Sequence, residues 1–162
     1  MIHEFNINCL NRSTILKANI KVSQVDHGEN LLEYADDTES WNDKDAHLFT
    51  SFCRLRKYLK EKEKIMLCKG CRRNVHPFAS QLAWMYAFVL TKGKRVDHKK
   101  DKVLIFEEEL DVEQIVDVEE QEKFYREWWE IAMGRSPDRI SSGNRMGSFL
   151  SYLKRIFKKG EK

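Results

Sequence analysis

Residues 14–25 read TILKANIKVSQV, and their side chains alternate between polar and apolar, with many β-branched residues among them. Alternation with a period of two is typical of a strand that buries one face. The preceding residues 3–8, HEFNIN, repeat the pattern. A turn at 27–30, HGEN, is predicted to return the chain into a third strand, LLEYAD, at 31–36. The chain therefore begins with predicted antiparallel strands.

A helix is predicted next, with Asp43 or Asp45 as its N-cap and its end near Glu63. Its apolar residues recur at spacings of three and four. They are Leu48, Phe49, Phe52, Leu55, Tyr58 and Leu59. We expect this stripe to pack on the sheet. The residues just before it, DDTESWNDKD at 36–45, are predicted to form a loop rich in acidic residues.

The middle of the chain adds short strands and a second helix. Strands are predicted at 64–68, 84–91 and 103–108; the second, WMYAFVLT, is apolar enough to be central, although its length also fits a helix. A basic loop separates the last two strands. The second helix is predicted to start within the acidic residues 107–122 and to continue through FYREWWEIAM at 124–133.

This order of elements predicts an α+β fold: a single domain over residues 1–133 with a mixed or antiparallel sheet packed by helices. Residues 134–162 are predicted to form a linker, GRSPDRISSG, and a basic amphipathic C-terminal helix capped by Asn144 and packed on the same domain. The apolar stripe of that helix consists of Met146, Phe149, Leu150, Leu153, Ile156 and Phe157.

Charge is distributed in blocks along the 162 residues, although the formal net charge is only +3. The net charge is −5 over residues 1–45, +11 over 54–102, −9 over 107–122 and +6 over 134–162. Such blocks steer charged partners, unless they fold against one another and cancel. No apolar run approaches the length of a membrane span, so we expect no stable membrane insertion. The four cysteines are too few for a secreted disulfide framework, which predicts a cytoplasmic protein with reduced thiols.

The segment Leu67–Phe78, LCKGCRRNVHPF, has several interpretations. Cys68 and Cys71 have the spacing of a zinc knuckle, but only His76 and His98 remain as further ligands, at unusual spacing. A redox pair or a Cys–His nucleophile needs a helix N-terminus or a third orienting group, and the sequence indicates neither. The two cysteines are therefore interpreted as small, half-buried hydrophobic residues at a strand end.

A nucleic-acid-binding module is the alternative functional class. Basic residues of segment 54–102 are interleaved with Trp84, Tyr86 and Phe88, which suits stacking on single-stranded bases. The aromatic residues alternate within an apolar run, so we expect them to face a core. A metal or redox protein built on Cys68, Cys71 and His76 is the third hypothesis.

Four stretches, LCKGCRRNVHP, AFVLTKGK, VLIFEEE and EEQEKFYREWW, together resemble a group of small bacterial immunity proteins of polymorphic toxin systems, including contact-dependent growth inhibition. The resemblance covers residues 64–129. His76 stands where the group has Tyr, and FAS at 78–80 replaces a small-residue turn. The motif residues that the resemblance marks as structural are Cys68, Gly70, Arg72 and Pro77.

The resemblance implies a binding protein without catalytic residues, metal or cofactor, whose partner is a cognate toxin domain. Because toxin nucleases are often basic, the acidic segments are the predicted contact face. Trp41 adds an aromatic anchor of the kind that interfaces favour. The candidate residues are Asp36, Asp37, Glu39, Trp41, Asp43, Glu107, Glu108, Glu109, Asp111 and Glu113. Arg72 is expected to satisfy carbonyl groups at a strand end.

Overall fold

The computed structural model describes residues 2–25, 28–78, 83–132 and 134. The predicted final helix and nearly all of the linker before it lie outside these residues.

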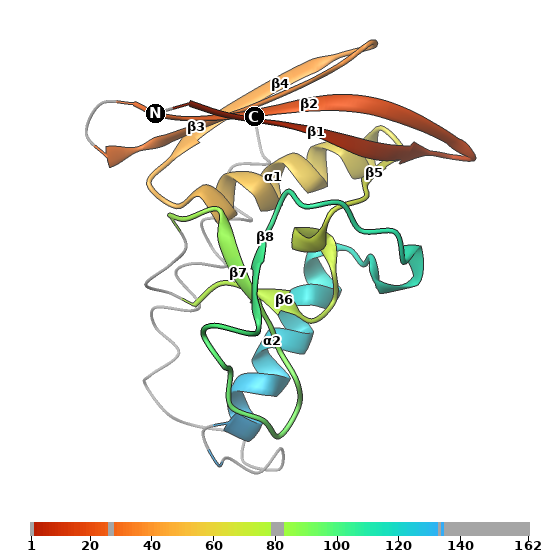
Figure 1. Ribbon diagram of the computed structural model, residues 1–162. Coiled ribbons are helices and arrows are strands. Elements are labelled where there is room, and N and C mark those ends of the chain that lie inside the picture. Colours follow the sequence, from red (N-terminus) through yellow and green to blue (C-terminus); the bar gives the residue numbers. More distant parts are fainter. Residues whose placement is uncertain (1, 26–27, 79–82, 133, 135–162) are drawn as a thin grey trace.

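The largest element is a curled five-stranded sheet, in which every neighbouring pair of strands is antiparallel (Figure 1). Its strand order is β4-β3-β2-β1-β5. The strands are β1 (Ile2–Asn11), β2 (Thr14–Gln24), β3 (Asn30–Asp36), β4 (Ser40–Asp45) and β5 (Lys64–Met66). The alternation of residues 3–8 and 14–25 places alternate apolar side chains in the core, so the first three predicted strands are confirmed.

Helix α1 (Leu48–Glu61) lies along the inner face of this sheet, between the sheet and the rest of the molecule (Figure 1). The predicted apolar stripe of the helix packs on the sheet, and Phe49, Phe52 and Leu55 are fully buried. The predicted N-cap was wrong, because the helix is preceded by His47.

Asp43 and Asp45 belong to β4, so the segment 36–45, which we expected to be a loop rich in acidic residues, is in large part a strand. Ser40, Asn42 and Lys44 are exposed, whereas the residues between them are at least partly buried. Strand alternation is therefore present in this segment. It was missed because two of the inward-facing residues are aspartates, which bind Arg54 of α1.

A second, smaller antiparallel sheet has the order β6-β7-β8, so the strands form two sheets rather than one. Its strands are β6 (Val75–His76), β7 (Tyr86–Val89) and β8 (Lys102–Leu104). The segment 84–91 contributes the central strand, as expected, but only four of its residues pair. Helix α2 (Val118–Ala132) packs beside this sheet (Figure 1).

One hydrophobic core links the two sheets, because Cys68, Cys71 and Val75 join the same buried cluster as the residues of β1–β3 and α1. A smaller cluster lies between β7 and α2 and contains Phe88, Leu90, Tyr125 and Trp128. The predicted α+β class is thus confirmed. The scaffold segment, which we define as residues 67–73, connects β5 of the larger sheet to β6 of the smaller sheet.

Candidate partner-binding site

The first acidic segment is largely occupied by internal contacts. The ammonium of Lys64 on β5 lies 2.6 Å from a carboxylate oxygen of Asp36 and 2.6 Å from one of Glu39. It also donates to the hydroxyl of Thr38 at 2.7 Å. The Tyr34 hydroxyl donates to Asp36 at 2.5 Å. These groups form a closed network beneath the curled sheet rather than a face for a partner.

The electrostatics of this network follow from its hydrogen bonds. Burial acts to raise the pKa of Asp36, but the bonds from Lys64, Tyr34 and Thr38 outweigh it and hold that pKa well below its usual range. For Lys64, burial acts to lower the pKa, and the bonds to Asp36 and Glu39 raise it overall. Both side chains are therefore charged at neutral pH, although they are 1% and 4% exposed.

The other candidates in this segment differ in their surroundings. Asp43 accepts hydrogen bonds from Ser51 at 2.9 Å and from Arg54 at 2.5 Å. Trp41 is half-buried, with its ring centroid 6.3 Å from that of Tyr58. Asp37 is exposed. Most carboxylates of the segment thus serve the fold, because α1 and β5 bring cations to them.

The second acidic segment contains a surface loop, which we call the acidic loop (residues 107–113). Its exposed acidic residues are Glu107, Glu108, Asp111 and Glu113. Two apolar side chains are exposed among them: Leu110 is 81% exposed and Val112 is 46% exposed. The loop therefore presents an apolar pair surrounded by negative charge.

Both ends of the acidic loop are held on the scaffold segment. Backbone hydrogen bonds run from Lys69 N to Glu107 O (2.8 Å), from Glu109 N to Leu67 O (3.1 Å) and from Arg73 N to Gln114 O (2.9 Å). Cys68 and Glu108 form an antiparallel bridge between the two segments. The motif LCKGCRR thus binds both ends of the acidic loop through backbone hydrogen bonds.

Side chains fix the conformation of the acidic loop further. Glu109, which is 8% exposed, lies 3.3 Å from Arg72 and accepts a hydrogen bond from the amide of Asp111 at 2.9 Å. The Asp111 carboxylate caps a short 3-10 helix, Val112–Gln114, by accepting from the amide of Glu113 at 3.2 Å. Arg72 therefore pairs with a carboxylate, whereas we expected it to bind strand-end carbonyls.

The scaffold segment is itself tightly packed. A Cβ atom at Gly70 would lie 2.8 Å from the Phe52 ring and 2.9 Å from both a side-chain and a backbone atom of Ile105. The amide nitrogen of the Gln121 side chain lies 2.7–2.8 Å from the carbonyl oxygens of Gly70, Arg72 and Val75. Only glycine fits at position 70, and α2 is bonded directly to the scaffold.

The cysteines and His76 belong to this packed region. The sulfur atoms of Cys68 and Cys71 lie 3.6 Å apart and both thiols are free. The His76 ring contacts oxygen atoms through both nitrogens: Nδ1 lies 2.6 Å from the carbonyl of Pro77 and Nε2 lies 3.0 Å from Glu122. Among the described residues, no group of three or more His, Cys, Asp or Glu side chains is placed to hold a metal ion.

The aromatic residues of β7 and the turn before it correct one expectation. Phe88 is 2% exposed and packs in the smaller cluster, but Trp84 and Tyr86 are 56% and 38% exposed. The ammonium of Lys102 lies 4.0 Å from the centroid of the Tyr86 ring. Two of the three aromatic residues are therefore exposed, and one of them, Tyr86, lies beside a cation. Trp84 precedes the paired part of the strand, which begins at Tyr86.

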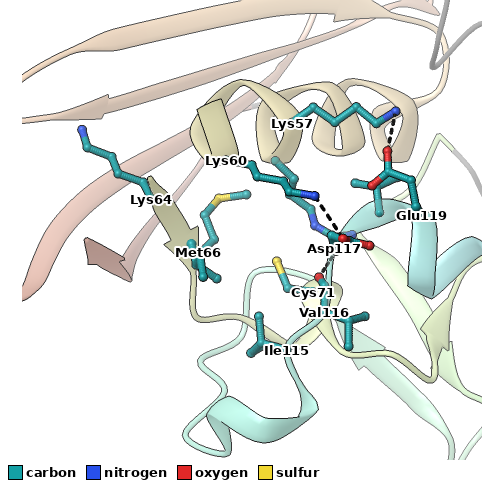
Figure 2. Close-up of a pocket in the computed structure, with 12 residues that line it drawn as sticks. Lys57, Lys60, Lys64, Met66, Cys71, Ile115, Val116, Asp117 and Glu119 are labelled. Carbon is teal, nitrogen blue, oxygen red and sulfur yellow. Dashed lines mark hydrogen bonds and ion pairs between the residues drawn. The ribbon is translucent and has the colours of Figure 1, made fainter. Parts of the chain in front are cut away.

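A pocket of about 270 Å³ opens between α1, β5 and residues 115–119 (Figure 2). Lys57 and Lys60 on its rim pair with Glu119 and Asp117 at 3.1 and 3.0 Å. Its other lining residues include Arg56, Met66, Cys71, Ile115, Val116 and Val118. Its rim charges are thus paired across the opening.

The comparisons with known proteins add no relative: no protein-family model matches the chain, and no curated protein matches it significantly. Within the described residues, no helix is both long and apolar enough to cross a bilayer.

Three features of the site were missed from the sequence: the exposed Leu110, the Gln121 contacts and the pairing of Lys64 with Asp36. For the exposure of Leu110, the one signal in the sequence is an isolated leucine within an acidic run. The Gln121 contacts join residues 46 or more positions apart and the Lys64–Asp36 pair joins residues 28 positions apart, which periodicity does not reveal.

Proposed function

We propose that the protein is a non-catalytic immunity protein that neutralises a cognate bacterial toxin domain, and that the acidic loop is its contact surface. The observation that carries this proposal is Leu110, which is 81% exposed between carboxylates on a loop held at both ends. An exposed apolar side chain ringed by charge suits an interface anchor with a polar rim.

The chemistry of the loop defines the partner. Glu107 is paired with Lys69, and the carboxylates of Glu108, Asp111 and Glu113 attract a basic surface and accelerate encounter with it. Leu110 and Val112 then require an apolar recess within that basic surface. A nuclease domain, which holds its phosphate substrate with cations, has such a basic surface. Covering that surface would block its substrate.

The fixed geometry of the loop supports the same proposal. Because Glu109 and Asp111 bind within the loop and its ends bind the scaffold, little freedom remains to be lost on binding. A preorganised loop gives tight binding from a small surface, which suits a protein that must outcompete a toxin's substrate.

The test is native mass spectrometry of this chain co-expressed with the C-terminal domain encoded by its upstream neighbour, together with growth of the expressing cells. We expect a stable complex, and growth that fails when this chain is omitted. Leu110→Ser should weaken binding on the order of 30-fold, the effect of losing an anchor worth about 2 kcal/mol.

Ile2→Ser is the matched control, because Ile2 is 60% exposed but lies on β1, outside the acidic loop. It should bind as the unaltered chain does. A complex that is equally sensitive to both substitutions, or insensitive to both, would place the contact elsewhere. Absence of any complex and of any protection would overturn the immunity proposal itself.

Binding of single-stranded nucleic acid is the second candidate, favoured by the exposed Trp84 and by the exposed Tyr86, which lies beside Lys102. Stacking of bases on such rings contributes about 1 to 3 kcal/mol per base. Fluorescence anisotropy with a labelled single-stranded oligonucleotide tests it: Trp84→Ala should weaken binding, whereas Trp129→Ala, which removes a 41% exposed indole from α2, should not.

A further inference from the structure

Cys68 and Cys71 lie at the two ends of a single turn, and their sulfur atoms are 3.6 Å apart. The amide of Cys71 donates to the carbonyl of Cys68 at 2.9 Å, so the backbone already brings the residues together. A disulfide has sulfurs about 2.05 Å apart, so side-chain rotation that closes about 1.5 Å would join them. The scaffold thus holds two free thiols in near-bonding geometry.

The two thiols differ in their position relative to the pocket, although both are almost fully buried, at 0% exposed for Cys68 and 1% for Cys71. Cys71 lines the pocket between α1 and residues 115–119, and Figure 2 shows its sulfur directed toward the space beside Met66. Cys68 is fully buried in the main core and does not line this pocket. A small molecule that enters the pocket therefore contacts Cys71 and not Cys68, whose sulfur is 3.6 Å from that of Cys71.

The surroundings also favour Cys71 as the reactive sulfur. Burial acts to raise its pKa, but the hydrogen bond from Cys68 and the nearby guanidinium of Arg56 lower it overall. Arg56 is held in place by bonds to the Gln121 side chain at 2.5 Å and to the carbonyl of Val116 at 2.7 Å. The cation is thus fixed beside the thiol, inside the same pocket.

We propose that Cys68 and Cys71 are a peroxide-reactive dithiol, with Cys71 as the attacking thiol and Cys68 as the resolving thiol. The Cys71 thiolate attacks one oxygen of hydrogen peroxide and the O–O bond breaks, which leaves a sulfenic acid and, after protonation, water. The Cys68 sulfur then attacks Cys71, the S–O bond breaks and a second water leaves. Two thiols lose two electrons, one peroxide gains them, and a dithiol reductant reverses the change.

This inference goes beyond the proposed function, because the disulfide forms whether or not a partner is bound. Oxidation would also affect the acidic loop. Cys68 forms a β-bridge with Glu108, and the Cys71 carbonyl accepts a hydrogen bond from the amide of Val116 at 3.1 Å. Oxidation therefore adds a disulfide bond to the turn that binds the acidic loop.

The test uses the full chain, treated with hydrogen peroxide under native conditions, quenched by thiol alkylation and mapped by peptide mass spectrometry. We expect a Cys68–Cys71 cross-link that dithiothreitol removes. Cys9 is the internal comparison, because it is equally buried and burial raises its pKa to about 11. Cys71 should lose its free thiol at least about tenfold faster than Cys9, since each unit of pKa changes the thiolate fraction about tenfold.

Two variants separate the steps. Cys68→Ser should leave a sulfenic acid at Cys71 that a dimedone probe captures, and Cys53→Ser should cross-link as the unaltered chain does. The proposal is overturned if Cys71 reacts no faster than Cys9, or if Cys68→Ser loses the Cys71 thiol without a captured sulfenic acid. Circular dichroism before and after peroxide distinguishes native oxidation from oxidation of an unfolded chain, which would also overturn it.

Discussion

The ammonium of Lys64 lies 2.6 Å from a carboxylate oxygen of Asp36, and both side chains are almost completely buried. The pair joins β5, at one edge of the five-stranded sheet, to the end of β3 near the other edge. It thereby closes the curl of the sheet over α1. Because a buried charge needs its partner, this network is a sensitive point of the fold.

Removing the cation should destabilise the protein strongly. Lys64→Met leaves the carboxylates of Asp36 and Glu39 without their shared ammonium, and we expect a loss of about 3 to 5 kcal/mol in the free energy of unfolding. Lys44→Met, on the exposed side of β4, should change it by less than about 0.5 kcal/mol. Urea denaturation measures the free energy of unfolding of each variant. Equal losses in the two variants would contradict the role of Lys64 in the buried network.

The same pair predicts how stability depends on pH. The pKa of Asp36 is lowered on folding, so its contribution is present above the ordinary carboxyl value near 4 and is lost as pH falls through the lower folded value. The pKa of Lys64 is raised, so its contribution is lost only as pH rises through a value above 10.5. We expect a plateau over about pH 5 to 9 with an acid slope below it.

Asp36→Asn tests the source of that slope. It removes the titrating carboxylate, so the variant should be less stable at pH 7 and should lose less stability on acidification than the unaltered chain. Urea midpoints measured at intervals from neutral to acid pH give both numbers. An unchanged acid slope would assign the effect to other carboxylates.

Gly70 should be intolerant of any side chain. A Cβ atom there meets backbone as well as side-chain atoms at 2.9 Å or less, so Gly70→Ala should cost about 1 to 3 kcal/mol through overpacking. Gly93 provides a comparison with a different cause: its φ is +74°, but open space surrounds it. If the steric argument is right, Phe52→Leu should partly rescue Gly70→Ala and should not rescue Gly93→Ala.

The ion pair between Arg72 and Glu109 should determine how firmly the acidic loop is held. Arg72→Met keeps most of the side-chain bulk but removes the charge, so amide hydrogen exchange in residues 107–114 should accelerate, with a global loss of only about 1 kcal/mol. Arg73→Met is the control, since Arg73 pairs with Glu120 on α2 instead. Equal exchange in both variants would contradict the role of Arg72.

Much of the fold could be predicted because its pattern is local. β1, β2 and β3 alternate apolar and polar residues, and α1 repeats apolar residues at helical spacing. β4 was missed because its inward positions include Asp43 and Asp45, which read as loop residues until Arg54 is placed beside them. A charged residue at a buried position is intelligible only together with its partner.

The candidate site was predicted only in part. The negative charge of the acidic loop is visible in the sequence, but which carboxylates are free depends on cations supplied by distant elements, such as Lys64 for Asp36. The exposure of Leu110 depends in the same way on the scaffold that holds the loop away from the core. Such pairings are tertiary, and a single sequence does not contain them.

The inward-facing aspartates of β4 also affect how separate molecules meet. β4 is the outermost strand on its side of the sheet, with one row of backbone groups not paired to β3. Such rows promote strand addition between chains and aggregation, and charged residues that point inward discourage it, because an added strand disturbs their pairing. Arg54 therefore has a second consequence: because it holds Asp43 and Asp45 in the strand, we expect it to disfavour pairing of this edge with a second copy.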